Sequence, residues 1–272
     1  MKVKSKKTIA CIMISLMLVL TAVVWYQISP PAEDASSANM AQVKTIVLDP
    51  GHGGMDGGAT GGSGSVEKDV NLAVSLNLRD MLRMAGYQVV MTREEDISIH
   101  DPSANTVREK KVSDIRNRLK ILEKNPDSLF VSIHQNKFPQ SQYSGSQVFY
   151  SVNHPFSETL AQSVQQQLVT QLQPDNNRVI KPMAKGAYLL EHAKTPAVVV
   201  ECGFLSNPEE EAKLTTPEYQ SKLAFAIFCG ISQAGQFSNN ESSAVSSASS
   251  SAFGASQGIS EVPMSSGTQP AA

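Results

Sequence analysis

Cysteine is scarce in this sequence, which has three in 272 residues. Cys11 lies within an apolar run near the amino end, so only Cys202 and Cys229 remain in the rest of the chain. Two cysteines exclude a fold built on a disulfide framework. A single Cys202–Cys229 disulfide stays open, although two buried thiols are the simpler interpretation. The fold must therefore depend on a hydrophobic core, and 41% hydrophobic residues are enough to form one.

The sequence also lacks an excess of basic residues and any internal repeat at the spacing of solenoid proteins. It contains 23 basic and 25 acidic residues. Without the four lysines of residues 1–7, 19 basic residues remain against 25 acidic ones, a net charge of −6. Nucleic acid is a poor partner for such a surface, and we expect no nucleic-acid binding.

The amino end carries a candidate membrane segment. Residues 1–7 form a basic end without acids, and residues 8–25 are apolar over a length that can cross a bilayer. Lysines before an apolar run keep the amino end in the cytoplasm, so the rest of the chain is expected to be exported. A retained anchor would hold it at the outer face of the cell membrane, whereas a cleaved signal peptide would release it. The length of the run and the lack of a small-x-small site after Trp25 favour the anchor.

Composition divides the remaining chain into a linker, one folded domain and a tail. Residues 26–44 are small and polar and are predicted to be a linker. Residues 238–272 are rich in Ser and Ala and are predicted to be disordered, because they cannot bury enough apolar surface to fold. The folded domain is therefore expected to span residues 45–237.

Within that domain, apolar periodicity alternates between strand and helix. Strands are predicted at residues 45–48, 87–92, 127–134, 146–152, 187–191 and 197–201, and helices at residues 67–85, 111–124, 158–172 and 217–237. Strands that alternate with helices form largely parallel sheets covered on both faces. The sequence thus predicts a single α/β domain with a mostly parallel, twisted sheet and helices on both faces.

A glycine-rich loop after the first predicted strand exposes a histidine, His52, within Asp-Pro-Gly-His-Gly-Gly (residues 49–54). Such glycines would also suit a phosphate-binding turn, but no Gly-Lys-Ser/Thr follows them. Taken alone, the loop is equally compatible with a functional histidine and with a purely structural turn.

Three further candidates fall at the same edge of the predicted sheet. His134 ends one strand, Glu201 ends another, and Glu67 begins the first helix, whose amino end returns to that edge. Two imidazoles and a carboxylate can bind zinc with one open position, leaving the other carboxylate beside a bound water. Singly, His134 could be an ordinary polar residue and Glu67 a helix-dipole partner. Glu201 is harder to explain structurally, because it follows Val-Val-Val and a buried unpaired charge is costly.

This set of residues suits amide hydrolysis. Zinc lowers the pKa of its water toward about 7 and polarises a carbonyl, while a glutamate takes the proton and returns it to the leaving amine. A serine hydrolase is disfavoured because no Gly-x-Ser-x-Gly elbow is present. Cys202 should point away from Glu201, since neighbouring strand residues face opposite ways. The other histidines, His100, His154 and His192, are interpreted as surface residues.

Four sequence segments together resemble the zinc-dependent N-acetylmuramoyl-L-alanine amidases of the amidase-3 type, which hydrolyse peptidoglycan. They are Val47–Gly54, Glu67, Ser132–Asn136 and Val200–Glu210. The resemblance implies one zinc ion per chain, bound by His52, Glu67 and His134, with Glu201 as the catalytic acid/base. It further implies cleavage of the amide between the lactyl group of N-acetylmuramic acid and L-alanine of the stem peptide. Glycines such as Gly53 and Gly54 are then expected to leave a groove for a glycan strand beside the metal.

Residues 109–119 and 201–207 are most similar to the germination-specific amidases of endospore formers. This likeness implies action on spore cortex on the way to muramic lactam, in the forespore envelope. Position 135 is Gln where the family commonly has Ala. The implied partners are peptidoglycan strands with stem peptides and, through residues 8–25, a membrane; no particular protein partner is indicated. Two other functions stay open: a catalytically silent wall-binding module, and a zinc hydrolase of a different amide.

Overall fold

The computed structural model describes residues 44–183 and 185–253, of which residues 236–253 are described as helix backbone only. The basic end (1–7), the candidate membrane segment (8–25) and nearly all of the predicted linker lie outside the described residues, as does the chain after Phe253. None of the helices in the described part is both long enough and apolar enough to span a bilayer.

The centre of the domain is a six-stranded sheet with the order β2-β1-β3-β6-β4-β5. β1, β2, β3 and β6 run parallel, and β4 is antiparallel to β6. The predicted α/β domain with a mostly parallel sheet is therefore confirmed. The strands are β1 (Thr45–Pro50), β2 (Gln88–Met91), β3 (Ser128–Asn136), β4 (Gln147–Tyr150), β5 (Lys181–Pro182) and β6 (Ala197–Phe204).

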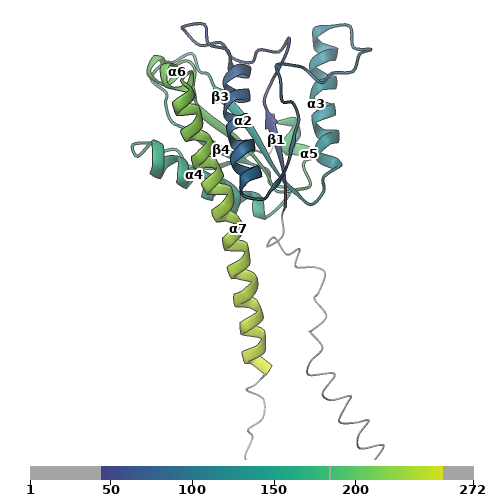
Figure 1. The fold of residues 1–272 in the computed structure, drawn as a ribbon, viewed down its shortest axis with the longest axis vertical. Coiled ribbons are helices and arrows are strands. Elements are labelled where there is room, and N and C mark those ends of the chain that lie inside the picture. Colours follow the sequence, from purple (N-terminus) through teal and green to yellow (C-terminus); the bar gives the residue numbers. More distant parts are fainter. Residues whose placement is uncertain (1–43, 184, 254–272) are drawn as a thin grey trace, which may run out of the picture. The chain divides into compact units, whose positions relative to one another are not determined.

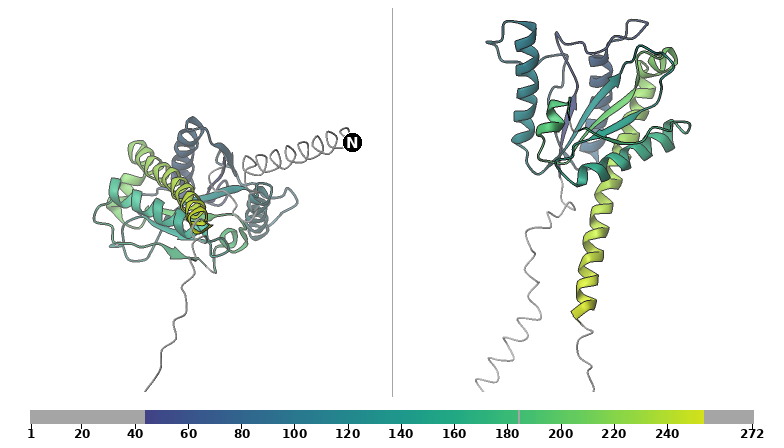
Figure 2. Two further views of the ribbon diagram at one scale, coloured as in Figure 1. Left: turned by 90° about the horizontal axis from the view of Figure 1, so that it is seen from below. Right: turned by 180° about the vertical axis from the view of Figure 1, so that it is seen from behind.

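Helices cover both faces of this sheet (Figure 1, Figure 2). One face packs against α2 (Glu67–Met84), α4 (Phe156–Leu172) and α7 (Pro217–Phe253), and the other against α3 (Val107–Glu123) and α5 (Tyr188–His192). A short helix, α6 (Pro208–Leu214), follows β6. The alternation of side chains along β1 explains the two layers: Ile46 and Leu48 join the first cluster, whereas Val47 joins the second.

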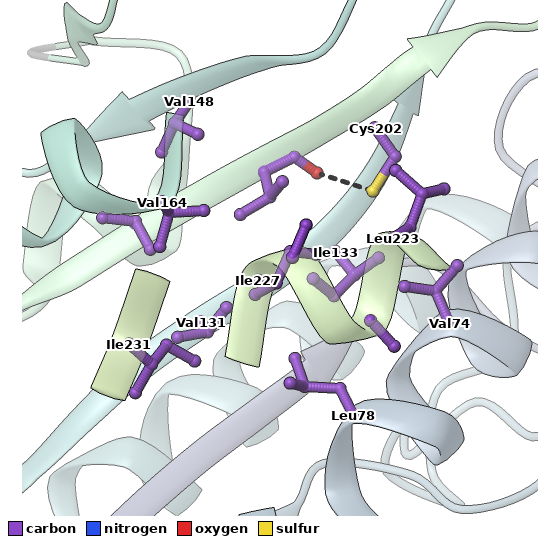
Figure 3. Close-up of a cluster of buried hydrophobic side chains, with 14 of the residues drawn as sticks. Val74, Leu78, Val131, Ile133, Val148, Val164, Cys202, Leu223, Ile227 and Ile231 are labelled. Carbon is purple, nitrogen blue, oxygen red and sulfur yellow. Dashed lines mark hydrogen bonds between the residues drawn. The ribbon is translucent and has the colours of Figure 1, made fainter. Parts of the chain in front are cut away.

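The larger core lies between the sheet, α2 and α7 (Figure 3). Leu78 from α2 and Ile227 from α7 are fully buried there against strand residues such as Val131. Each such side chain contributes about 1.5–3 kcal/mol by leaving water. Cys202 is also buried in this core, on the opposite side of β6 from Glu201, as predicted. Cys202 and Cys229 are free thiols, so the fold depends on this core and not on a disulfide.

Several elements differ from the prediction, and two of them, β5 and α6, were not predicted at all. The strand expected at residues 187–191 is wrong, because this segment forms α5, and a short apolar run does not distinguish a strand from a helical turn. Asn153 stabilises that turn by donating to the carbonyls of Leu190, Glu191 and Ala193. α3 begins before residue 111 because Thr106 and Glu109 form a capping box. α7 continues past residue 237 to Phe253, into the segment with the composition of a disordered tail.

Candidate metal centre

β1 leads into the glycine-rich loop at the carboxyl edge of the sheet. The backbone nitrogen of Gly51 still bonds the carbonyl of Ile133 at 3.0 Å, and the chain then turns sharply at His52. His52 has φ +62°, a left-handed conformation that is uncommon for a residue with a side chain. The surrounding structure must therefore hold this residue in place.

Arg118 of α3 holds the loop by hydrogen bonds to its backbone. Its Nη2 donates to the carbonyl of His52 at 2.6 Å, and its Nη1 donates to the carbonyl of Pro50 at 2.8 Å. The same guanidinium pairs with Asp49 at 2.6 Å, and both side chains are buried. Burial alone would raise the pKa of the Asp49 carboxyl, but the charge of Arg118 and hydrogen bonds from Ser132 and Thr92 outweigh it and lower the pKa. The loop is thus attached to α3 through a fully charged, buried pair.

A second arginine, Arg93, supports the same turn. It donates to the carbonyls of Pro50 and Gly51, each at 3.0 Å, and to that of Lys68 at 2.8 Å. Neither Arg93 nor Arg118 was predicted as part of the site. The position of Asp49 near the end of an apolar strand could have indicated a cationic partner such as Arg118, because a buried carboxylate requires one.

The structure brings His52, Glu67 and His134 together. One nitrogen or oxygen from each lies within 4.8 Å of the others. Oε1 of Glu67 lies 3.3 Å from Nε2 of His52 and 2.9 Å from Nδ1 of His134, and the two rings meet edge to face at 5.1 Å between centroids. Two imidazoles and a carboxylate that converge in this way could hold a metal ion, and zinc sites with an open position use this donor set.

Charge interactions dominate within this cluster. Glu67 is only 4% exposed, and burial would raise the pKa of its carboxyl; the hydrogen bonds and charges of His134 and His52 outweigh burial and lower the pKa. Burial would likewise lower the pKa of His52, but Glu67 and then Asp56 raise it to about 9. The carboxylate is therefore ionised, as a metal ligand must be, and a bound cation would take the place of the ring protons that pair with it here.

Asp56 sets the orientation of the His52 ring. Its Oδ2 lies 3.0 Å from Nδ1 of His52, which leaves Nε2 facing Glu67. Lys111 of α3 holds the other oxygen of Asp56 at 2.7 Å. A carboxylate on the outer nitrogen of a histidine fixes the tautomer that a metal needs. Asp56 and Lys111 were missed from the sequence, although the loop carries an aspartate four residues after the histidine.

Two glycines leave space for these side chains. A Cβ on Gly51 would collide with the imidazole of His134, and a Cβ on Gly58 would lie 2.5 Å from Oε2 of Glu67. The expectation for Gly53 and Gly54 needs correction. They face the segment 93–98 and not a groove, since a Cβ on Gly53 would meet the carbonyl of Ile97 and one on Gly54 the nitrogen of Ser98.

Glu201 lies opposite His134 in the pairing of β3 with β6. Its Oε2 is buried and has no hydrogen-bond partner among the described residues. Burial raises the pKa of the Glu201 carboxyl to about 7; nearby His134 lowers it in part, and Glu67 raises it. Burying an oxygen without a hydrogen-bond partner costs folding free energy. A role in proton exchange near neutral pH accounts for Glu201 better than a structural role does.

Glu67 receives further hydrogen bonds from the chain around it. The backbone nitrogens of Ala59 and Gln135 donate to its oxygens at 2.7 and 3.1 Å. Asn71, which the sequence did not single out, connects the Gln135 side chain to the carbonyl of Gly51. The remaining histidines lie elsewhere: among the described residues, His100 and His154 are half-buried, His192 is exposed, and none joins the cluster.

Comparison with known proteins connects this geometry to an enzyme family. Residues 46–233 match the family model described as N-acetylmuramoyl-L-alanine amidase. The germination-specific N-acetylmuramoyl-L-alanine amidase of Bacillus subtilis (strain 168) is 39% identical over 188 residues, which cover 69% of this chain and 78% of that protein. The N-acetylmuramoyl-L-alanine amidase AmiA of Escherichia coli (strain K12) is 30% identical to this chain. The matched region covers 69% of this chain and 75% of AmiA.

Solved structures give the same result. The CwlD amidase from Clostridioides difficile, determined in complex with the GerS lipoprotein, superposes with a TM-score of 0.68 at 41% identity, covering 70% of this chain and 98% of that one. The N-acetylmuramoyl-L-alanine amidase AmiC2 of Nostoc punctiforme superposes with a TM-score of 0.61 at 30% identity, covering 71% and 97%.

Proposed function

This chain belongs to the N-acetylmuramoyl-L-alanine amidase family and is an amidase of peptidoglycan, and we propose that it works as a zinc enzyme with one metal ion per chain. In this proposal His52, Glu67 and His134 are the ligands. Glu201 is the general acid/base, and the bond cleaved is the amide between the lactyl group of N-acetylmuramic acid and L-alanine of the stem peptide.

One observation carries the proposal. The three ligand atoms of His52, Glu67 and His134 converge within 4.8 Å, and the buried, unpartnered oxygen of Glu201 belongs to the residue paired with His134 in the sheet. A structural role would leave Glu201 with an unsatisfied buried oxygen and no compensation. A catalytic role needs an oxygen that is free to accept a proton.

The chemistry follows from this arrangement. Zinc, when bound, would polarise the amide carbonyl and favour ionisation of a water. Glu201 accepts the proton of the attacking water as its oxygen bonds to the lactyl carbonyl carbon. The carbon–nitrogen bond then breaks, and Glu201 returns the proton to the nitrogen of L-alanine. The products are a lactyl carboxylate on the glycan and a free amine on the stem peptide.

Residues outside the ligand set position His52. Asp56 fixes the ring through Nδ1, and Lys111 fixes Asp56. Arg118 holds the backbone of the same residue through its carbonyl. Because Arg118 contacts His52 directly and Lys111 acts on it through Asp56, the geometry of the centre depends on α3 as well as on the loop.

We further propose spore cortex peptidoglycan as the substrate, on the path to muramic lactam. The support is the 39% identity to a germination-specific amidase and the 41% identity to CwlD. The protein would then act outside the cytoplasm, in the forespore envelope, anchored by residues 8–25 or released if they are cleaved. A lipoprotein partner is proposed by analogy, since the CwlD structure contains one.

Metal content and product analysis test the proposal together. The full chain should contain about one zinc and release stem peptides from purified cortex, detected by mass spectrometry of the digest. Glu201→Gln should keep its zinc and release none, whereas His134→Ala should lose both. Undiminished release by metal-free protein would refute the zinc mechanism. Binding of cortex without any release would favour a silent wall-binding module. Competition by small soluble amides that lack muramic acid, such as free amino-acid conjugates, would favour a different amide substrate.

A further inference from the structure

Two large aromatic side chains stand exposed on the loop between β3 and β4. Phe138 is 44% exposed and Tyr143 is 42% exposed, and their ring centroids lie 5.4 Å apart. Beneath them, the ring of Phe204 is buried and stacks on Phe138 at 5.5 Å between centroids. We call Phe138, Tyr143 and Phe204 the aromatic platform.

Contacts at both ends of its loop hold the platform in place. The backbone nitrogen of Phe138 donates to Oγ of Ser206 at 3.1 Å, and that of Gly145 donates to Oε1 of Glu210 at 2.8 Å. The guanidinium of Arg178 lies 4.5 Å from the centroid of the Phe204 ring. A surface fixed before its ligand arrives loses little conformational entropy on binding.

The platform lies next to the candidate metal centre. β3 carries His134 and ends at Asn136, two residues before Phe138; a chain advances at most about 3.6 Å per residue, so the Cα atoms of His134 and Phe138 are within about 14 Å of each other. Lys137 also donates to the carbonyl of Thr60 at 2.8 Å, which ties this loop to the glycine-rich loop. A polymer that continues from the reacting centre by one or two sugar rings can therefore reach the platform.

The size of the platform decides what it can bind. An aromatic side chain offers roughly 150–250 Å² of surface, so two rings that are less than half exposed present about 200 Å² between them. A stable protein interface buries about 800 Å² on each partner, far more than this pair provides. One sugar ring, whose flat face of C–H groups packs on aromatic faces, fits the available surface.

We propose that Phe138 and Tyr143 form a glycan subsite that stacks on a sugar ring adjacent to the reacting muramoyl residue. The inference rests on the proposed function, because it takes the glycan of peptidoglycan as the polymer that leaves the metal centre. It assigns this enzyme a preference for glycan strands over single muropeptides. This preference would come from the position of the two rings and not from the candidate metal ligands.

Binding to insoluble peptidoglycan tests the subsite apart from catalysis. In the full chain carrying Glu201→Gln, the added pair Phe138→Ala and Tyr143→Ala should weaken co-sedimentation with sacculi about tenfold, a change equal to about 1.4 kcal/mol. The same pair in the otherwise unchanged enzyme should leave hydrolysis of soluble N-acetylmuramoyl-L-alanyl-D-isoglutamine unaffected. Failure of the proposed function would look different, because the enzyme with its platform intact would then hydrolyse neither substrate.

Two variants control for packing. Phe225→Ala removes a phenylalanine of similar exposure, 49%, from α7 and should bind sacculi normally. The pair Phe138→Leu and Tyr143→Leu keeps the apolar bulk on Phe204 but removes the rings, so it remains informative if the alanine pair does not fold. Stacking predicts that the leucine pair also binds weakly. Normal binding by that pair overturns the proposal. The proposal also fails if free stem peptide inhibits binding to sacculi and a peptide-free N-acetylglucosamine tetramer does not.

Discussion

Nη2 of Arg118 lies 2.6 Å from the carbonyl oxygen of His52, so α3 holds the backbone of a candidate metal ligand. His52 has φ +62°, and the loop alone does not favour that conformation. Arg118 also contacts Asp49 and the carbonyl of Pro50, which makes it the common support of β1 and the loop. The candidate metal centre therefore depends on residues outside the ligand set.

Replacing Arg118 with lysine should weaken both the fold and the metal centre. Lysine keeps the charge but cannot reach Asp49 and the carbonyls of Pro50 and His52 together as the planar guanidinium does. We expect a loss of about 1.5–3 kcal/mol in the free energy of unfolding, as for lost hydrogen bonds to a charged group, and weaker zinc binding. Urea unfolding and competition with a chelator measure the two effects. Arg116→Lys, on an exposed position of the same helix, is the control, and unchanged zinc affinity in Arg118→Lys would contradict the prediction.

Asp56→Ala should lower zinc affinity by about 10–100-fold while the fold is retained, because the outer nitrogen of His52 loses its partner. Lys111→Ala should act in the same direction with a smaller effect, since it acts only through Asp56. Isothermal titration with zinc is the measurement. Asp69→Ala removes an exposed carboxylate of α2 and should leave the affinity unchanged. If Asp56→Ala binds zinc as well as Asp69→Ala does, the orienting role is wrong.

Gly51→Ala should displace the His134 ring, because the added methyl group would collide with it. Gly51 does not have positive φ, so this variant reports the collision without backbone strain. A displacement of about 1 Å in a catalytic site can cost about 100-fold in turnover. We expect a loss of that size in stem-peptide release at unchanged secondary structure. Gly62→Ala, where a Cβ would meet only an ordinary contact at 3.6 Å, is the matched control and should keep full activity.

Glu211 should make stability depend on acid pH. Burial would raise the pKa of its carboxyl, but hydrogen bonds from Ser63 and Ser65 outweigh it and lower the pKa to about 2. A lowered folded-state pKa gives stability that is present above the unfolded pKa near 4.5 and is lost as pH falls toward 2. Glu211→Gln should therefore lose about 2–3 kcal/mol of unfolding free energy at pH 7.

The difference between wild type and Glu211→Gln should then shrink below about pH 4.5, measured by urea unfolding from pH 7 to pH 3. Glu209→Gln, at an exposed position of the same helix, should track the wild type throughout. A gap that stays constant down to pH 3 would show that the carboxylate charge of Glu211 is not what stabilises the loop of residues 61–65.

Much of the fold followed from local pattern. The alternation of apolar strands with amphipathic helices predicted the parallel sheet, and strand ends placed His134 and Glu201 at one edge, since parallel strands finish on the same side. Periodicity failed at residues 187–191, because Leu189 and Leu190 are buried by contacts with the α3 side of the sheet, and Asn153 secures the turn from another element. No window of sequence around that segment contains this information.

The sequence by itself determined which histidines and glutamates follow strands or begin a helix, and that a glycine-rich loop carries the first of them. Only the tertiary structure decided how those side chains are held. Arg118 contacts His52 across 66 residues of chain, and Asn71 accepts a hydrogen bond from Gln135 across 64. Phe138 stacks on Phe204, which belongs to a different strand. Hydrogen bonds and packing depend on distance in space, whereas sequence patterns report periodicity over one or two turns of chain.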